Sequence, residues 1–136
     1  MACLDTTFFI DLKGRSGSPL VRRAEAILEQ LQATEEHAVT TRFNVAELYA
    51  GAIRSSRPER ELSFIESILE DFEILEFDAA AAEEFGNLKS HVLNIGRPTG
   101  DMDLLIGAVA KINGEHVVTR NPRHFAQMPG VGVVTC

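Results

Sequence analysis

Acidic residues stand at three distant points of the chain where apolar segments begin or end. Asp5 follows the apolar residues "ACL", Glu47 lies within the mostly apolar "FNVAELYAGA", and Asp103 precedes the apolar run "LLIGAVA". An ionised carboxylate beside a buried segment is costly unless a cation or a hydrogen-bond donor stabilises it. Carboxylates that converge from distant segments also repel one another, and a shared proton or a divalent cation relieves that repulsion.

The chemistry that such a cluster supports is narrow. The four histidines show no zinc-ligand spacing, and a site built from oxygen ligands alone suits Mg²⁺ or Mn²⁺. The common use of that chemistry is in-line attack of water on a phosphodiester, in which the metal activates the water and stabilises the leaving oxygen. A GxGxxG motif and a Walker lysine loop are both missing from the sequence, so a nucleotide-cradling mechanism lacks its parts.

Each polar residue also has an ordinary structural interpretation. Asp5 could be a turn residue or a helix N-cap, and Glu47 could lie with Asn44 on one wet stripe of a helix. The residues Thr119 and Asn121 of "VVTRN" could receive a water or a metal, or could form a polar turn. The functional interpretation therefore depends on whether these residues converge.

The stretch "RPTGDMDLLIGAVA" holds two aspartates two residues apart. Asp101 follows Gly100 at the expected N-cap position of a helix, and Asp103 falls in its first turn. Residues two apart on a helix do not share a face. We therefore predict that Asp103 points toward the other acids, whereas Asp101 is either the cap or an outer ligand.

Hydrophobic spacing predicts short strands that alternate with helices. The expected strands cover residues 1–5, 37–41, 73–77, 116–120 and 131–136, and the expected helices cover 6–14 (as a turn or short helix), 19–36, 42–56, 57–72, 78–96 and 101–114. This alternation indicates a parallel sheet covered on both faces. Ligand sites in such sheets lie beyond the carboxyl ends of the strands, where chain direction switches. Asp5, Glu47 and Asp103 are thereby directed to one edge of the sheet.

Composition limits the class of protein. The 136 residues are 45% hydrophobic and carry a formal net charge of -7, which excludes a broad basic face for nucleic acid but allows local arginines. No apolar run reaches the roughly 20 residues that span a bilayer, and the N-terminus has no basic lead, so we expect a cytoplasmic protein without a membrane segment. Two cysteines, Cys3 and Cys136, make a disulfide framework unexpected.

Four motifs in order resemble PIN-domain ribonucleases, specifically the VapC-like toxins of bacterial toxin–antitoxin pairs. "LDTTFFIDL" resembles the opening strand, with Thr7 in place of Ser or Asn, and "TRFNVAELYAG" resembles the second motif, with Glu47 as its acid. "RPTGDMDLLIGAVA" resembles the third motif, with Asp103 as its acid and Gly107 where Ala is usual, and "VVTRNPRHFAQMPGVGV" resembles the closing segment.

The resemblance implies one PIN domain over residues 1–136, folded as a three-layer α/β/α sandwich on a mainly parallel sheet. It implies an endoribonuclease that depends on Mg²⁺ or Mn²⁺, a VapB-like antitoxin, a homodimer and a hetero-oligomer with the antitoxin. Asp5, Glu47 and Asp103 would be the acidic core and metal ligands, and Asn121 takes the fourth, often acidic position. Thr6 and Thr119 would be supporting hydroxyls, and Asp101 or Asn121 would orient the attacking water or a second ion.

Arginines flank these motifs and could bind RNA phosphates, or could be ordinary surface charges; they are Arg42, Arg97, Arg120 and Arg123. One alternative function is a PIN-like binding module with a catalytically weak site. Another is a different Mg²⁺-dependent phosphoesterase such as a phosphatase. An aspartyl phosphatase commonly has a second Asp two residues after the first, whereas Thr6 and Thr7 follow Asp5 here.

Overall fold

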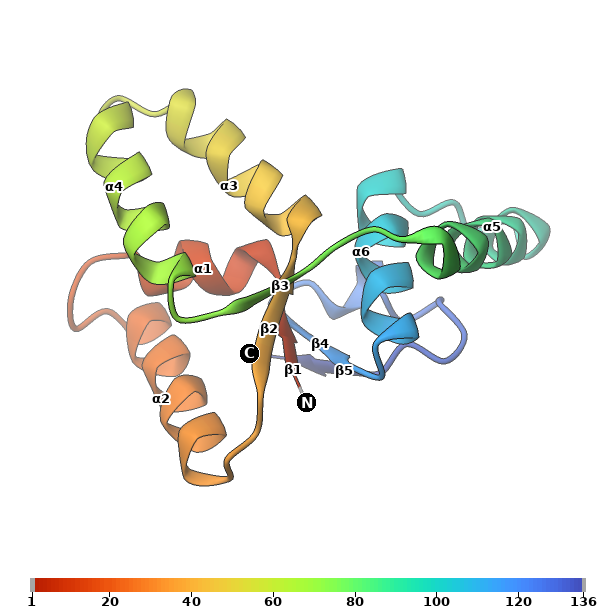
Figure 1. Ribbon diagram of the computed structural model, residues 1–136, viewed down its shortest axis with the longest axis horizontal. Helices are drawn as coiled ribbons and strands as arrows, with labels where there is room; N and C mark the ends of the chain where they lie inside the picture. The colour runs from red at the N-terminus through yellow and green to blue at the C-terminus, as the bar shows by residue number, and fades with distance from the viewer. Residues whose placement is uncertain (1, 136) are drawn as a thin grey trace.

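A computed structural model describes residues 2–135 and contains a central sheet with helices on both faces (Figure 1). The elements run β1 (Ala2–Leu4), α1 (Thr6–Leu12), α2 (Pro19–Ala33), β2 (Ala38–Thr41), α3 (Arg42–Ile53), α4 (Pro58–Leu69), β3 (Glu73–Leu75), α5 (Ala79–Asn94), α6 (Asp101–Ile112), β4 (His116–Thr119), the 3-10 turn η1 (Pro122–His124) and β5 (Val133–Thr135). Every strand and helix predicted from the sequence is present within residues 2–135, and its bounds there are shorter than predicted. Residues 1 and 136 of the first and last predicted strands lie outside the described residues. No helix in the described part of the chain combines the length and apolar character needed to cross a membrane.

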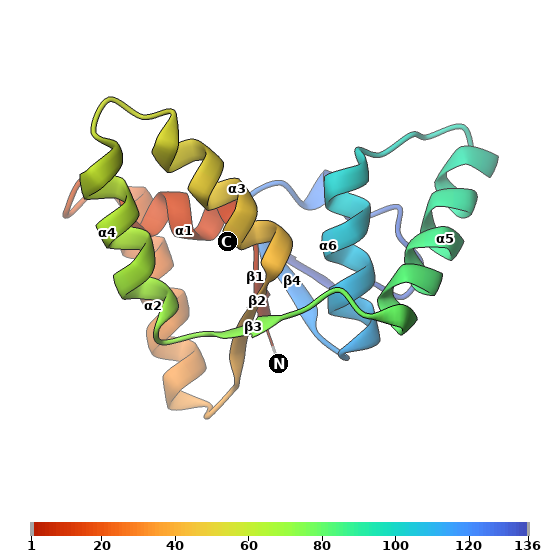
Figure 2. The ribbon, with the colours of Figure 1, turned by 45° about the horizontal axis from the view of Figure 1, so that its top comes forward.

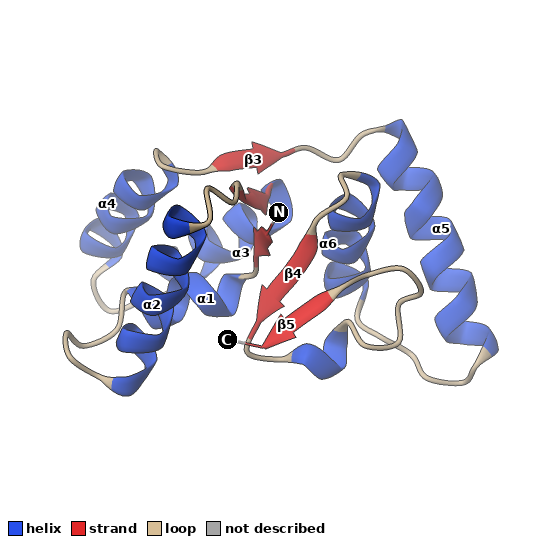
Figure 3. Cartoon of the chain, turned by 90° about the horizontal axis from the view of Figure 1, so that it is seen from below, coloured by secondary structure: helices blue, strands red, loops and turns tan. Residues whose placement is uncertain are grey.

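The sheet has five parallel strands in the order β3-β2-β1-β4-β5. Successive strands are added outward on one side of β1 as far as β3, and the chain then returns to the other side of β1 as β4 (Figure 3). The order in which strands are added therefore reverses between β1 and β4. We call the side of the sheet formed by the C-terminal ends of all five strands the carboxyl edge. The side formed by their N-terminal ends is the amino edge. A parallel sheet with such a switch opens a crevice at the carboxyl edge, between the two strands on either side of the switch.

Two helical layers cover the sheet: α1 to α4 lie on one face, and α5 and α6 lie on the other (Figures 1 and 2). Successive strand residues alternate between two buried clusters. Leu4 and Val118 join the cluster under α1 to α4, whereas Cys3 and Val117 join the cluster under α5 and α6. Because both faces of each central strand are buried, the strands read as short apolar runs. The predicted α/β/α sandwich is confirmed.

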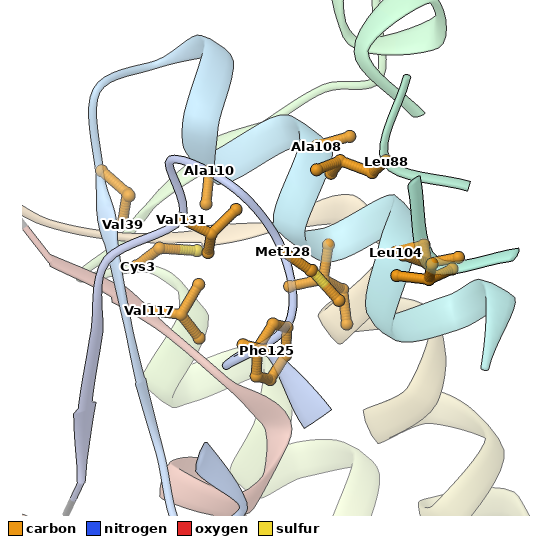
Figure 4. Packing of buried hydrophobic residues seen from close by; sticks show 12 residues of the cluster. Cys3, Val39, Leu88, Leu104, Ala108, Ala110, Val117, Phe125, Met128 and Val131 are labelled. Carbon is orange, nitrogen blue, oxygen red and sulfur yellow. The ribbon is translucent and has the colours of Figure 1, made fainter. Parts of the chain in front are cut away.

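The segment after β4 belongs to the second cluster. Phe125, Met128 and Val131 are buried there beside α6 and Cys3 (Figure 4). A Cβ atom built on Gly107 would lie 2.4 Å from the Sδ atom of Met128. Met128 thus occupies the room that an alanine methyl group would need, which explains the glycine in the third motif. Cys3 is a buried free thiol, and Cys136 lies outside the described residues.

Helix starts follow the local rules at most positions. Ser18 and Asp78 cap α2 and α5 through their side chains. Of the two roles left open for Asp101, the cap is not observed, because Gly100 is the N-cap and Asp101 is the first helical residue. Its carboxylate accepts a hydrogen bond from the Nζ atom of Lys89 at 2.7 Å, on the surface between α5 and α6.

Candidate active site

Asp5 is the centre of the polar cluster at the carboxyl edge. It directly follows β1, is 6% exposed, and its backbone N–H donates to the carbonyl of Val118 at 3.0 Å. Its Oδ1 accepts from the amide Nδ2 of Asn44 at 2.9 Å, and its Oδ2 accepts from the hydroxyl of Thr119 at 2.7 Å. Neutral donors from α3 and β4 therefore fix the orientation of this carboxylate without cancelling its charge.

Asn44 is a site residue that the sequence interpretation missed. It is fully buried, which excludes the alternative that it lies on a wet stripe of the helix. Thr41 and Asn44 form the capping box of α3, in which the Asn44 side-chain oxygen accepts from Thr41 and leaves its Nδ2 free to donate to Asp5 and Thr6. A threonine N-cap followed three residues later by an amide was the signal that could have revealed this role.

Glu47 lies one helical turn after Asn44 and is half-buried. Its Oε1 accepts from the hydroxyl of Thr6 at 2.7 Å. Burial raises the pKa of Glu47, the Thr6 hydrogen bond opposes this, and the charges of Asp5 and Asp103 raise the pKa further. Glu47 therefore belongs to the same electrostatic cluster as the other two acids.

Asp103 enters from the first turn of α6, on the other face of the sheet. Burial raises its pKa, the nearby His124 lowers it, and the charge of Asp5 raises it. The Nδ1 atom of His124 lies 2.9 Å from Oδ2 of Asp103. Sequence spacing gave no sign of His124, because the turn η1 brings it to Asp103 from a segment 21 residues further along the chain (124 minus 103).

The three acids couple electrostatically at the switch between β1 and β4, where the sequence directed them. Their donor atoms are all oxygens, which fits Mg²⁺ or Mn²⁺ in type. No group of three or more acidic, histidine or cysteine side chains within residues 2–135 is already close enough to form a metal cage. A cation that keeps several of its waters fits this open arrangement, since Mg²⁺ is usually held by one or two carboxylates and substrate phosphates.

The other predicted site residues divide by their contacts. Thr6 and Thr119 lie at the cluster as supporting hydroxyls. The backbone N–H of Asn121 donates to the hydroxyl of Thr119 at 3.0 Å, and the Asn121 side chain is exposed at the end of β4. Asp101 faces Lys89 on the surface.

The four arginines also separate into two pairs. Arg42 forms an ion pair with Glu76, and the Nε of Arg120 lies 3.2 Å from the buried carboxylate of Asp11. Arg97 and Arg123 form no ion pair with any residue in the range 2–135, and they line hollows on the Asp103 side of the site.

Comparison with known proteins agrees with this geometry. The PIN domain family matches residues 2–131. A tRNA(fMet)-specific endonuclease VapC of Shigella flexneri is 31% identical over 106 residues, which is 78% of this chain and 80% of that protein. A ribonuclease VapC2 of Haemophilus influenzae is 34% identical over 107 residues, which is 79% of this chain and 81% of that protein.

Solved structures show the same fold. The DNA-bound VapBC structure from Salmonella typhimurium superposes with a TM-score of 0.84 at 28% identity and covers 98% of this chain and 96% of that one. The VapBC2 structure from Rickettsia felis bound to a promoter DNA fragment gives a TM-score of 0.87 at 24% identity, over 99% and 98% of the two chains. With its acids gathered at the switch point of a parallel sheet, this chain belongs to the PIN-domain family and, within it, to the VapC ribonucleases.

Proposed function

We propose that this protein is a metal-dependent endoribonuclease that hydrolyses RNA phosphodiester bonds at Asp5, Glu47 and Asp103 and acts as the toxin of a toxin–antitoxin pair in the cytoplasm. The observation that carries the proposal is that three distant segments bring these carboxylates to the carboxyl edge, where Asn44 and Thr6 link Asp5 to Glu47 by hydrogen bonds. The charge of Asp5 also raises the pKa of Glu47 and of Asp103. Mutual repulsion at a half-buried site is the property that a divalent cation relieves.

The three carboxylates would hold Mg²⁺ or Mn²⁺, some of them through water. The bound ion supplies a nucleophilic water and stabilises charge on the leaving oxygen. Asn44 and Thr119 keep both oxygens of Asp5 in one orientation, and Thr6 does the same for Glu47. Asn121, exposed at the end of β4, is better placed to orient the attacking water than Asp101, whose carboxylate is engaged by Lys89.

The proposed partner is a VapB-like antitoxin. The similar structures from Rickettsia felis and Salmonella typhimurium are VapBC complexes bound to DNA. An arginine from such a partner, inserted among Asp5, Glu47 and Asp103, would neutralise the acidic cluster without a metal and would inhibit the enzyme. The family resemblance also leads us to expect a homodimer.

The experiment is RNA cleavage by an Asp5→Asn variant in Mg²⁺ or Mn²⁺. We expect the rate to fall by at least about a hundredfold, because the change removes the central negative charge and leaves the shape nearly unchanged. The matched control is Glu73→Gln, which makes the same carboxylate-to-amide change at the amino edge and should cleave RNA like the unaltered protein. Circular dichroism checks that both variants are folded.

Two results would contradict the proposal. Undiminished cleavage by the Asp5→Asn variant would show that the acid cluster is not the site. An unaltered protein that binds an antitoxin but cleaves no RNA in either metal would favour the binding-module alternative.

A further inference from the structure

Two hollows on the Asp103 side of the site meet at Gln127. The first has a volume of about 560 Å³ and is lined by Asp103, Arg123, His124 and Gln127 together with the loop before α6. The second has a volume of about 590 Å³ and runs from Gln127 to Arg97 and to His91 near the end of α5. Both are open to solvent, as a surface that binds a polymer must be. We call the two together the Gln127 groove.

The charge of the groove differs from that of the whole molecule. The chain carries a formal charge of -7, but Asp103 is the one acidic residue among the described residues that line the groove. Arg97 and Arg123 lie along it without ion-pair partners in residues 2–135, whereas Arg42 and Arg120 are held by Glu76 and Asp11. Guanidinium groups that are not neutralised by the protein favour phosphate oxygens.

Gln127 adds a second kind of contact at the junction. Its Oε1 is buried, and no group within residues 2–135 donates a hydrogen bond to it. A buried amide oxygen without a donor is unfavourable. Gln127 lines both hollows, so a rotation that turns its amide into the groove, where a bound molecule supplies a donor, is favoured. A glutamine side chain offers one acceptor and two donors, the combination that matches the edges of unpaired nucleobases.

We propose that the Gln127 groove binds single-stranded RNA next to the scissile phosphate. Arg97 and Arg123 contact successive backbone phosphates, and Gln127 contacts the edge of one base. This inference rests on the proposed function, because Asp103 connects the groove to the cleavage site. The two contacts have different consequences, since phosphate contacts set affinity and its dependence on salt, whereas a base contact sets sequence preference.

The first test measures RNA affinity by fluorescence anisotropy. The probe is a labelled single-stranded RNA of about ten nucleotides with randomised sequence, within the usual size of single-strand sites. All proteins carry Glu47→Gln, so that cleavage does not consume the probe. We expect Arg97→Ala with Arg123→Ala to weaken binding and to reduce the slope of log affinity against log salt by about 0.7 per arginine.

The matched control is Arg22→Ala with Arg54→Ala, which removes the same charge from exposed positions on α2 and at the end of α3. If the two double variants lose equal amounts of RNA affinity, the proposal that the groove binds RNA is overturned. Cleavage by the unaltered protein would then leave the proposed function standing. Conversely, a groove-dependent affinity in a protein that cleaves no RNA would support the groove and overturn the proposed function.

The second test sequences the ends of RNA products made by Gln127→Ala in an otherwise unaltered protein. We expect the preference for one base beside the cut to fall by about tenfold, with the salt dependence of binding unchanged. An unchanged cleavage pattern would overturn the role of Gln127. Loss of antitoxin binding by the groove variants, with RNA affinity intact, would identify the groove as a protein-binding surface instead and would overturn the proposal.

Discussion

The sheet carries one group of three carboxylates at each edge, and the two groups are stabilised differently. The groups are Glu36, Glu73 and Glu115 at the amino edge and Asp5, Glu47 and Asp103 at the carboxyl edge. At the amino edge, Glu73 pairs with His37 and Glu36 lies 3.8 Å from His116, so that two acids have histidine partners. The third acid there, Glu115, is buried with one oxygen that receives no hydrogen bond within the described residues, and burial raises its pKa. Two of the three acids in this group therefore have a partner that can carry positive charge. The raised pKa of Glu115 does not distinguish the edges, because burial also raises the pKa of Glu47 and of Asp103.

At the carboxyl edge most of the partners are neutral. Asn44 and Thr119 donate to Asp5, Thr6 donates to Glu47, and only Asp103 has a histidine beside it. Neutral donors hold carboxylates in place and leave their negative charge available. The comparison teaches that the number of acids does not identify a metal-binding edge; the charge of the groups that support them does.

The largest expected effect comes from Asn44→Leu, which keeps the side-chain size and removes the amide. The buried Oδ1 of Asp5 would lose its donor, so we expect the free energy of unfolding to fall by about 2–4 kcal/mol. Cleavage should fall by at least about a hundredfold. Urea unfolding and RNA cleavage measure the two effects. A fully active Asn44→Leu variant would show that neutral donors do not maintain the site.

An Asn44→Asp variant sharpens the same comparison. It adds a fourth carboxylate, which burial and the charge of Asp5 would keep protonated to a pH above its ordinary pKa. Between the two pKa values the folded state binds more protons than the unfolded state, so stability rises as pH falls. We therefore expect the difference in the free energy of unfolding between the unaltered protein and this variant, measured by urea unfolding, to become smaller as pH falls. A difference that is independent of pH would contradict this explanation.

Thr119→Val removes the hydroxyl donor to Oδ2 of Asp5 and changes little else in shape. We expect a loss of about 1–3 kcal/mol in the free energy of unfolding and roughly tenfold slower cleavage. The matched control is Thr40→Val, since the hydroxyl of Thr40 is also buried but donates to the carbonyl of Leu4 at 2.8 Å. The control should lose stability and keep its cleavage rate within about twofold. Equal losses of activity would remove the special role of Thr119.

The smallest expected effect is on the free energy of unfolding when one glutamate at each edge becomes glutamine, and its sign differs between the two edges. Glu47→Gln should raise the free energy of unfolding in metal-free buffer at neutral pH by a few tenths to about 1 kcal/mol, because a half-buried and repelled charge is lost. Glu73→Gln removes an exposed partner of His37 and should cost at most about 0.5 kcal/mol. Thermal unfolding of both variants with a chelator present measures the difference.

The gain from Glu47→Gln should also depend on pH. Because the pKa of Glu47 is raised in the folded state, the unaltered protein becomes more stable as pH falls through that pKa. The Glu47→Gln variant cannot take up this proton. Its higher free energy of unfolding relative to the unaltered protein should therefore disappear at acidic pH. An advantage that persists below the ordinary pKa of glutamate would point to packing instead of charge.

Apolar spacing and the switch-point rule were sufficient to predict the sheet, the helices and the convergence of Asp5, Glu47 and Asp103. They could not predict Asn44 or His124, because the roles of these residues depend on partners that only the folded chain brings near. The choice between the two roles of Asp101 depended on one residue, since the helical conformation begins at Asp101 and the N-cap is Gly100, with φ of -57° and ψ of 143°. The ion pairs of Arg42 and Arg120 join residues 34 and 109 positions apart, and no periodicity records such contacts.

Gly107 has a consequence that reaches beyond packing. Met128 is seated against it, and Met128 and Phe125 hold the segment that carries His124 and Gln127 close to α6. The packing of Met128 and Phe125 in the hydrophobic core therefore helps to set the width of the Gln127 groove. In related chains with a bulkier residue at this position, either the Met128 side chain turns away or the segment that carries it shifts. A shift of the segment would change the shape of the groove, so preference among RNA substrates can diverge while every catalytic side chain stays the same.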